Sequence, residues 1–324
     1  MKVLIIRYSS LGDVILTTPI IRAFVRQSSA IVHYITKEVC APLLEDNPFI
    51  SKLWIHEKTK IKDLQAQNYD HVIDLQGSLR SVRLKALLGH FRKSYNKERW
   101  KTKKFIRSKN LLLAPSHVVL RYFDTVKRFD ITYDGQGLDL ISTPKVHQEV
   151  REKYHIAVVL GGTHITKRLP SSLVSGLIER KDLFFSLLGG TDIDKKPFKE
   201  ASHVMNYIGR SSLKESIAIV DQSDFVITGD TGLMHVAAAL SKPMVVVWGS
   251  TSPDMGFRPF YKDASRAKNF DILLGLDCQP CSKYGKKTCP LSHMNCLNEV
   301  KIQSIHGRID EMITYTAQLD RQKN

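Results

Sequence analysis

The sequence predicts an α/β protein made of two Rossmann-like domains, each a doubly wound parallel sheet with helices on both faces. Short apolar runs, typical of strands buried on both faces, alternate with stretches of helical spacing in both halves of the chain. This alternation fades over residues 135–150 and restarts at His155. The 324 residues also exceed what one core usually supports. We therefore expect domains over residues 1–150 and 151–324, with ligands bound in the cleft between them.

The first half begins with a buried-type strand and a loop of turn-forming residues that leads into a helical pattern. Pro19 lies inside that pattern, over residues 14–25, so the helix must kink or restart there. Further strands are expected at 31–35, 53–55 and 71–75. The last of them ends in Gln76-Gly77 before a helix, and another helix is expected over about 117–129.

The second half repeats the strand–helix alternation. Strands are expected at 155–160, 183–188, 204–208, 225–228 and 244–248. Helices are expected at about 171–180, 212–220, 231–240 and 301–319. Gly161-Gly162 follows the first of these strands, and Lys167 and Arg168 bring positive charge to the same strand end.

The turn Gly229–His235 joins a buried strand to a helix and carries the clearest chemical pattern. Asp230, Thr231 and Gly232 lie where backbone N–H groups and the helix dipole favour a negative ligand. Gly232 has no Cβ, which lets a phosphate approach the backbone. Asp and Thr are also common N-cap residues, so an ordinary cap is the alternative interpretation.

A second turn of the same kind contains Asp13, after the strand at residues 2–6. A carboxylate at the carboxyl end of a parallel strand is well placed to act as a general base. A helix cap again remains the alternative. Two such turns, one in each half, favour an active site over two independent caps.

The chain is basic, with 48 Lys and Arg against 32 Asp and Glu, and the densest basic run is residues 92–109. The positive electrostatic potential of such a chain attracts nucleic acid, an anionic membrane face or a phosphorylated substrate. A solvated surface that aids solubility is the alternative. The sequence contains no nucleic-acid-binding module, and Tyr95, Trp100 and Phe105 do not resemble a stacking platform, so we expect no nucleic-acid partner.

No apolar run approaches the roughly 18 residues of a membrane span, and the apolar block Met1–Ile6 is too short for a signal peptide. We expect a cytoplasmic protein.

Four of its five cysteines, with His293 among them, lie close together: Cys278, Cys281, Cys289 and Cys296. In such a compartment the cluster favours structural zinc or reduced thiols over disulfides, although its spacing matches no common zinc finger. Cys40 stands apart and is expected to be a buried apolar residue.

Four segments together resemble the lipopolysaccharide heptosyltransferase family, glycosyltransferase family 9. They are RYSSLGDVILTTPIIRAF at 7–24, DLQGSLRS at 74–81, TKRLP at 166–170 and GDTGLMHVAAALSKPMVVVWGSTSP at 229–253. The resemblance extends over essentially the whole chain. It implies a GT-B fold with the acceptor in residues 1–150, a nucleotide-sugar in residues 151–324, and a last helix that packs back toward the N-terminal domain. Members typically transfer heptose from an ADP-activated donor to the lipopolysaccharide inner core, with inversion and without a catalytic metal.

The resemblance also suggests roles for individual residues. Asp13 matches the catalytic base, and Lys167, Thr231 and Gly232 would stabilise the departing diphosphate. Asp230 would hold donor sugar hydroxyls, while His235 either faces the donor or packs in the core. The candidates to bind an anionic acceptor of the lipid A and Kdo type, at the inner face of the membrane, are Ser10, Gly12, Arg80, Arg83 and the basic run.

One departure concerns the donor. Where the family often has a Glu for the nucleoside, this chain has Lys214 beside Glu215, so both are candidates and the nucleotide base stays open. Two other functions are considered: a catalytically silent sugar-nucleotide or lipopolysaccharide-binding protein, and a nucleic-acid binder. Asp13 together with Lys167 argues against the silent binder, since binding alone requires no base.

Overall fold

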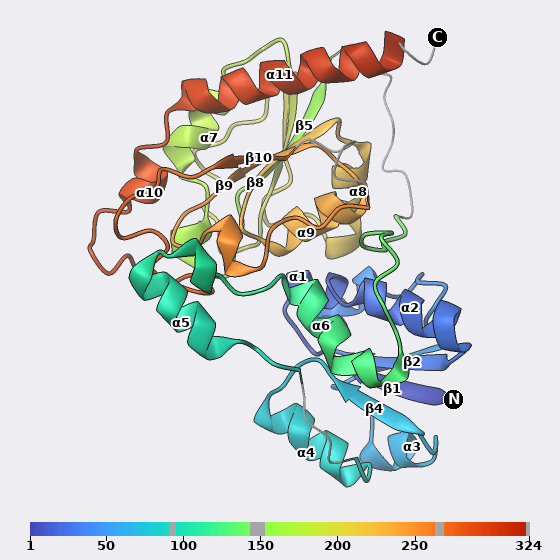
Figure 1. The fold of residues 1–324 in the computed structure, drawn as a ribbon. Coiled ribbons are helices and arrows are strands. Elements are labelled where there is room, and N and C mark those ends of the chain that lie inside the picture. Colours follow the sequence, from blue (N-terminus) through green and yellow to red (C-terminus); the bar gives the residue numbers. More distant parts are fainter. Residues whose placement is uncertain (91–94, 143–152, 263–268, 322–324) are drawn as a thin grey trace.

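The computed structural model describes residues 1–90, 95–142, 153–262 and 269–321. The expected boundary at residue 150 and the basic residues Arg92 and Lys93 lie outside these ranges. The two expected α/β units are present, with β1 and β5 as the central strands of two separate parallel sheets (Figure 1).

The N-terminal sheet has the strand order β3-β2-β1-β4, all parallel, so β1 pairs with both β2 and β4. The apolar residues Val3–Ile6 of β1 are fully buried, which accounts for the unbroken apolar run there. The elements of this half are β1 (Lys2–Ile6), α1 (Leu11–Ile15), α2 (Thr18–Ser28), β2 (Ile31–Thr36), η1 (Glu38–Leu43), β3 (Lys52–Ile55), α3 (Ile61–Gln65), β4 (His71–Asp74), α4 (Leu79–Leu87), α5 (Arg99–Ser108), η2 (Leu111–Leu113), α6 (Val118–Val126) and η3 (Lys127–Phe129).

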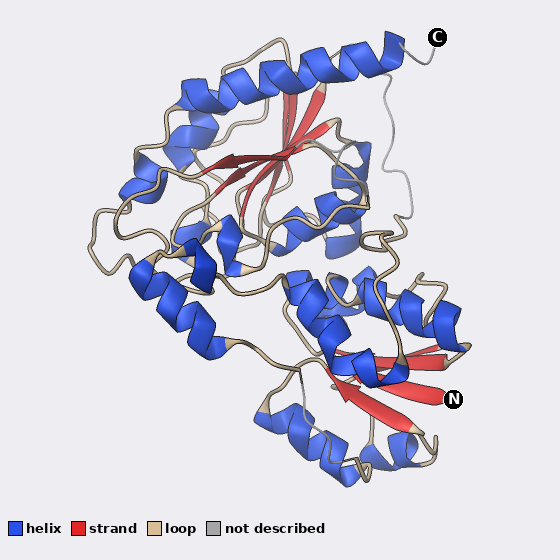
Figure 2. Cartoon of the chain, viewed as in Figure 1, coloured by secondary structure: helices blue, strands red, loops and turns tan. Residues whose placement is uncertain are grey.

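The C-terminal sheet has the order β10-β9-β8-β5-β6-β7, the doubly wound arrangement in which strand order reverses beside the first strand. Helices cover both of its faces (Figure 2). Its elements are β5 (His155–Val159), η4 (Ile165–Lys167), α7 (Ser171–Leu177), β6 (Phe184–Leu188), β7 (Val204–Asn206), α8 (Leu213–Gln222), β8 (Phe225–Gly229), α9 (Gly232–Ala239), β9 (Met244–Val247), η5 (Pro253–Met255), β10 (Asn269–Ile272), α10 (Asn295–Asn298) and α11 (Ile302–Arg321).

Most expected elements are confirmed to within a few residues. The helical pattern that contains Pro19 is divided into α1 and α2, with Pro19 in the first turn of α2, where its missing N–H costs nothing. Several elements were not expected, among them the short helices α3 and α10. The helix α5 occupies the basic run, and β10 forms an edge strand of the C-terminal sheet.

The expectation that the last helix packs back toward the N-terminal domain is wrong for the described residues. The helix α11 lies against α7, β9 and β10, at the far side of the C-terminal sheet (Figure 1). Its residues Ile305, Ile309 and Met312 are fully buried in the apolar cluster of that sheet. The apolar stripe of the helix is therefore satisfied within its own domain.

Candidate active site

The site lies where the strand order reverses in both sheets. In the N-terminal sheet this point is between β1 and β4, and in the C-terminal sheet it is between β5 and β8. The loops that follow β1, β5 and β8 line a cleft of about 930 Å³. Of the residues predicted from the sequence, eight line this cleft: Ser10, Gly12, Asp13, Lys167, Asp230, Thr231, Gly232 and His235.

On the N-terminal wall, Asp13 is held by a buried arginine. One guanidinium nitrogen of Arg7 lies 2.6 Å from Asp13 Oδ2, and another donates to the carbonyl oxygen of Leu75 at 2.6 Å. Ser10 donates to the same Asp13 oxygen through its hydroxyl (2.9 Å) and its backbone N–H (3.3 Å). Burial alone would raise the pKa of Asp13, but the Arg7 charge and the Ser10 hydrogen bonds hold it below its ordinary value. Asp13 is therefore an oriented, charged carboxylate.

On the C-terminal wall, an ion pair stands beside the start of α9. Lys167 Nζ lies 2.8 Å from Asp230 Oδ2, and the two side chains are only 15% and 10% exposed. Thr231 caps α9, because its hydroxyl oxygen accepts a hydrogen bond from the N–H of Met234 at 3.2 Å. The capping interpretation is thus correct for Thr231, and it leaves the rest of the helix start facing the cleft.

The two walls meet where α1 and α9 lie in contact (Figure 1). A Cβ on Gly232 would lie 2.8 Å from the Cβ of Leu11, and a Cβ on Gly12 would lie 2.6 Å from the His235 ring. His235 is both a packed residue and part of the cleft lining, since it is 4% exposed. Burial lowers its pKa to about 4, so it is neutral near pH 7.

Four predicted residues are not brought into the cleft. Glu215 lies in the first turn of α8, where its carboxylate accepts a hydrogen bond from the Ser212 N–H at 2.7 Å and completes a capping box. Lys214 pairs with Glu45 at 2.5 Å. Both are exposed, and Ser211, Leu213 and Ser216 line the cleft in their place.

The other two are the arginines of α4. Arg80 and Arg83 are exposed and do not line the cleft. The helix begins at the carboxyl end of β4, as the sequence indicated, but these side chains leave it toward solvent.

Lys283 and Tyr284 were not predicted from the sequence. They reach the N-terminal side of the cleft from residues 277–294, the cysteine-containing loop. Lys283 Nζ donates to the carbonyl oxygen of Lys97 at 3.1 Å. Burial, together with the nearby charges of Arg121, Lys97 and Arg99, lowers its pKa to about 8, although Asp13 opposes this shift. The cleft thus has a second cationic group close to the carboxylate.

The cysteine-containing loop, residues 277–294, also supports Lys167. The backbone N–H of Lys286 donates to the Thr166 hydroxyl at 2.8 Å, and that hydroxyl lies 2.8 Å from the hydroxyl of Ser250. Gly285, with φ of +96°, packs so closely that a Cβ there would lie 2.7 Å from both His164 Cβ and Lys167 Cδ. The loop therefore determines where the lysine can lie.

We expect Gly285→Ala to lower kcat by roughly tenfold, because the new methyl group must displace Lys167 and also imposes an unfavourable positive φ. Steady-state kinetics and a melting curve measure the two effects. Gly275→Ala is the matched control, since Gly275 has a φ of +67° but open space around its Cβ position. Equal kcat values for the two variants would contradict the support role of Gly285.

One small cavity of about 10 Å³ is lined by Cys278, Cys281, Cys289 and His293 of this loop and by Cys296 of α10. All five cysteines are free thiols. In the part of the chain that the structure describes, no three such side chains are arranged as ligands of a common metal ion. The isolated Cys40 is buried, as expected.

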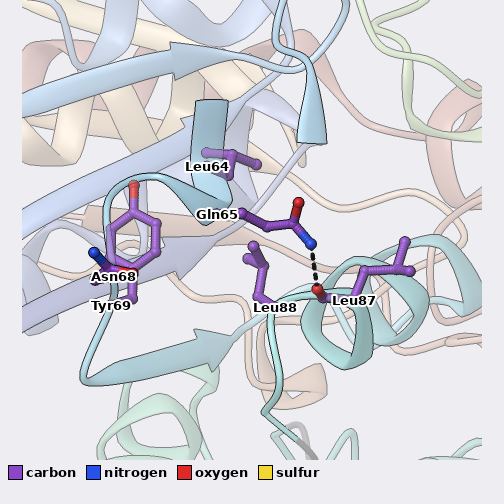
Figure 3. A pocket seen from close by; sticks show the side chains of 6 residues that line it. All are labelled: Leu64, Gln65, Asn68, Tyr69, Leu87 and Leu88. Atoms are coloured by element: carbon purple, nitrogen blue, oxygen red, sulfur yellow. Dashed lines mark hydrogen bonds between the residues drawn. The ribbon is translucent and has the colours of Figure 1, made fainter. Parts of the chain in front are cut away.

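A separate hollow of about 400 Å³ lies between α3 and α4, away from the cleft (Figure 3). It is bordered by the hydrogen bond from Gln65 Nε2 to the Leu87 carbonyl oxygen at 3.0 Å. Tyr69 is the only titratable residue among those that line it. This hollow offers no group suited to catalysis.

The model of glycosyltransferase family 9 (heptosyltransferase) matches residues 59–292, well over half of the chain. The chain belongs to this family. Lipopolysaccharide heptosyltransferase 1 of Campylobacter coli is 23% identical, over 96% of this chain and 99% of that protein.

Solved structures of family members have the same fold as this glycosyltransferase. The E. coli ADP-heptose lipopolysaccharide heptosyltransferase II superposes with a TM-score of 0.68 at 18% identity, over 98% of this chain and all of that one. The E. coli heptosyltransferase WaaC with ADP gives 0.67 at 18% identity, over 96% and 100%. The expected GT-B fold is confirmed. None of the helices described here combines the length and apolar character needed to cross a bilayer.

Proposed function

We propose that this glycosyltransferase moves a heptose from ADP-heptose to the lipopolysaccharide inner core, with inversion of the anomeric centre. The observation that carries the proposal is the arrangement of the two walls of the cleft. Asp13 lies on one wall, and the ion pair between Lys167 and Asp230 lies on the opposite wall. A relative of similar length is named lipopolysaccharide heptosyltransferase 1, and a structural neighbour was solved with ADP. The residues supply the groups that the reaction needs.

In the proposed reaction, the acceptor hydroxyl oxygen attacks the anomeric carbon on the face opposite the diphosphate. A bond forms between these two atoms as the bond from the anomeric carbon to the diphosphate oxygen breaks, and the hydroxyl proton passes to Asp13. The low pKa of Asp13 means that it accepts the proton late, once attack has made the hydroxyl acidic. Lys167 and the N-terminus of α9 stabilise the charge that develops on ADP.

The Lys167–Asp230 pair has a further use in this scheme. Without a donor, each ion neutralises the other in a largely buried position. When the donor binds, its diphosphate can replace Asp230 as the partner of Lys167. Asp230 can then accept hydrogen bonds from sugar hydroxyls. The pair thus keeps two donor-binding groups in position without leaving either charge buried and unpaired. No catalytic metal is required in this proposal.

Thermal stabilisation by nucleoside diphosphates tests the donor. ADP, GDP, UDP, CDP and TDP are compared, and a ligand at about a hundred times its dissociation constant should add roughly 2.7 kcal/mol to the free energy of unfolding. Selective stabilisation by ADP supports the proposal, and transfer from ADP-heptose to a Kdo-containing lipid A acceptor completes the test. ADP binding without transfer would favour the silent sugar-nucleotide binder.

The acceptor is proposed to be anionic, bound on the N-terminal side where Lys283 joins Asp13 in lining the cleft. We expect Lys283→Gln to raise the KM for this acceptor roughly tenfold, because it removes a cation that pairs with an acceptor carboxylate or phosphate. Lys283 is charged below its pKa of about 8, so in the wild type the acceptor KM should rise above that pH. Lys283→Arg, which stays charged, should flatten this rise. An unchanged acceptor KM in Lys283→Gln would contradict the role.

Structural zinc is also proposed, bound by thiolates of the cysteine-containing loop and of α10. The support is that one cavity is lined by Cys278, Cys281, Cys289 and Cys296, because four thiolates drawn together there would suit zinc. Such a metal would brace the loop that holds Lys167.

We expect about one metal ion per chain by elemental analysis of the purified protein. Chelation should lower the melting temperature, and Cys289→Ser should abolish binding. Cys40→Ser is the control, since Cys40 lies apart from the cluster. A metal-free wild-type protein with an unchanged melting temperature after chelation would overturn the site.

The lipid A portion of such an acceptor is embedded in a membrane, so we further propose that the enzyme works peripherally at the cytoplasmic face of the inner membrane. The support is the strong basic excess of the chain, which favours an anionic lipid surface.

A further inference from the structure

One surface of the N-terminal half combines exposed apolar and basic side chains. We call it the α5 surface and define it by Trp100, Lys103, Lys104 and Arg107 of α5 and by Leu111 and Leu112 of η2, which packs against α5. All six side chains are exposed. Figure 1 shows α5 at the outer edge of the molecule, outside the sheet-and-helix layers of the domain.

The apolar members of the α5 surface are not needed for packing. Trp100 is 68% exposed, Leu111 65% and Leu112 92%. The helix buries a different face through Phe105 and Thr102, which are each only 2% exposed. Single exposed leucines are ordinary, but a tryptophan and two leucines within thirteen residues form an apolar group that water solvates poorly.

The charge around this apolar group is strongly positive. Residues 97–112 contain seven Lys or Arg and one acid, Glu98. Glu98 is already satisfied, since it pairs with Lys101 at 2.6 Å and accepts from the Ser116 N–H at 2.9 Å. Lys104 Nζ lies 3.7 Å from the centre of the Trp100 ring, so charge and aromatic ring occupy the same face. Basic residues around exposed Trp and Leu match an interface between anionic headgroups and acyl chains.

The segment that carries α5 is also attached to the cleft. The Tyr95 N–H donates to the Asp74 carbonyl oxygen at 3.2 Å, and Lys97 Nζ donates to that of Gly77 at 2.9 Å, both at the carboxyl end of β4. The Lys97 carbonyl oxygen in turn accepts from Lys283 of the cleft. One short segment therefore joins the outer surface to the acceptor side of the site.

We propose that the α5 surface docks the enzyme on an anionic phospholipid bilayer, with Trp100 and Leu112 inserted among the headgroups. This inference rests on the proposed function, since it specifies how an enzyme acting on a membrane-embedded acceptor reaches it. Docking by this surface brings the acceptor side of the cleft close to the lipid. The charge complementarity and the exposed apolar side chains favour a bilayer over a protein partner, whose binding site would not require such an excess of charge.

Co-sedimentation with vesicles tests the docking. Phosphatidylcholine vesicles are compared with vesicles that contain about 30% phosphatidylglycerol. We expect the wild type to bind only the anionic vesicles. Trp100→Ser combined with Leu112→Ser, and Lys103→Gln combined with Lys104→Gln, should each weaken binding by roughly tenfold or more. The matched controls are Ile31→Ser, which is 47% exposed, and Lys195→Gln combined with Lys199→Gln in the C-terminal domain. These controls should bind as the wild type does.

Tryptophan fluorescence gives an independent measurement. Of the three tryptophans, Trp248 is fully buried and Trp100 is highly exposed. The emission should shift to shorter wavelength when anionic vesicles are added, and Trp100→Phe should lose this shift while still binding. Thermal stabilisation of each variant by ADP tests the donor site separately from vesicle binding. If ADP proves not to be the donor nucleotide, the vesicle experiment still tests the docking proposal.

Three outcomes would overturn the proposal. The wild type could fail to bind anionic vesicles, the α5 variants could bind as well as their controls, or the Trp100 emission could stay unchanged during binding. Self-association of the wild type that the α5 variants abolish, without vesicle binding, would instead identify an interface between copies of the chain.

Discussion

Replacing Asp13 with asparagine is expected to lower kcat/KM by at least about a hundredfold while ADP binding stays unchanged. The substitution keeps the shape of the side chain but removes the carboxylate that is proposed to receive the acceptor proton. Asp13 lies on the wall of the cleft opposite Asp230, so the change leaves the groups proposed for the donor untouched. Steady-state kinetics with both substrates and the thermal shift caused by ADP measure the two effects separately.

Stability must be measured alongside activity, because Asp13 also neutralises the buried Arg7. Losing that partner should cost on the order of 1–3 kcal/mol of the free energy of unfolding. Asp134→Asn is the matched control: it removes a carboxylate from another buried arginine, Arg22, at 2.7 Å and away from the cleft. The control should lose stability and keep its turnover. Turnover near the wild-type value in Asp13→Asn would show that another group is the base.

The low pKa of Asp13 also fixes the expected pH dependence. Its folded-state pKa lies below the ordinary aspartate value of about 3.9, so the Arg7–Asp13 pair stabilises the fold fully above that pH and loses its contribution as the pH falls through the folded value. The proposed base is therefore ionised throughout the neutral range. An acidic limb in the kcat/KM profile with a midpoint above about pH 5 would contradict this charge state.

The second large effect is expected at Lys167. Lys167→Gln should lower kcat by roughly a hundredfold to a thousandfold, because it removes the cation that is proposed to stabilise the charge on the departing diphosphate. The substitution also leaves Asp230 without its partner in a position that is only 10% exposed. Lys286→Gln is the control, since Lys286 is exposed and bonds to Thr166 through its backbone.

A double variant separates catalysis from stability at this pair. Lys167→Gln combined with Asp230→Asn removes both charges, so it should recover part of the stability that the single lysine variant loses. Its activity should not recover, because the cation is still missing. Recovery of both stability and activity in the double variant would mean that Lys167 serves only to neutralise Asp230.

The fold and the centre of the site could be predicted because their signals are local. Strands buried on both faces, such as β1 and β5, form continuous apolar runs, and the turns that hold Asp13 and Asp230 follow such strands directly. Topology then brings the carboxyl ends of these strands to the cleft. Pro19 marked the restart of a helix for an equally local reason.

The features that were missed depend on contacts between distant parts of the chain. Lys283 enters the site only because the cysteine-containing loop folds across to the Lys97 carbonyl oxygen, 186 residues away in sequence. Glu215 is drawn to Ser212 as a cap rather than to the cleft, and the spacing of residues does not distinguish these outcomes. The helix α5 has only Thr102 and Phe105 as its buried residues, so it lacks the apolar periodicity by which helices are recognised.

The contact between Gly12, Gly232 and His235 has a mechanical consequence. Since there is no room for even a methyl group between the two helix starts, the domains cannot slide past each other at this point without a clash. Because Asp13 follows Gly12 in α1 and Gly232 begins α9, this close contact sets how far Asp13 lies from the start of α9.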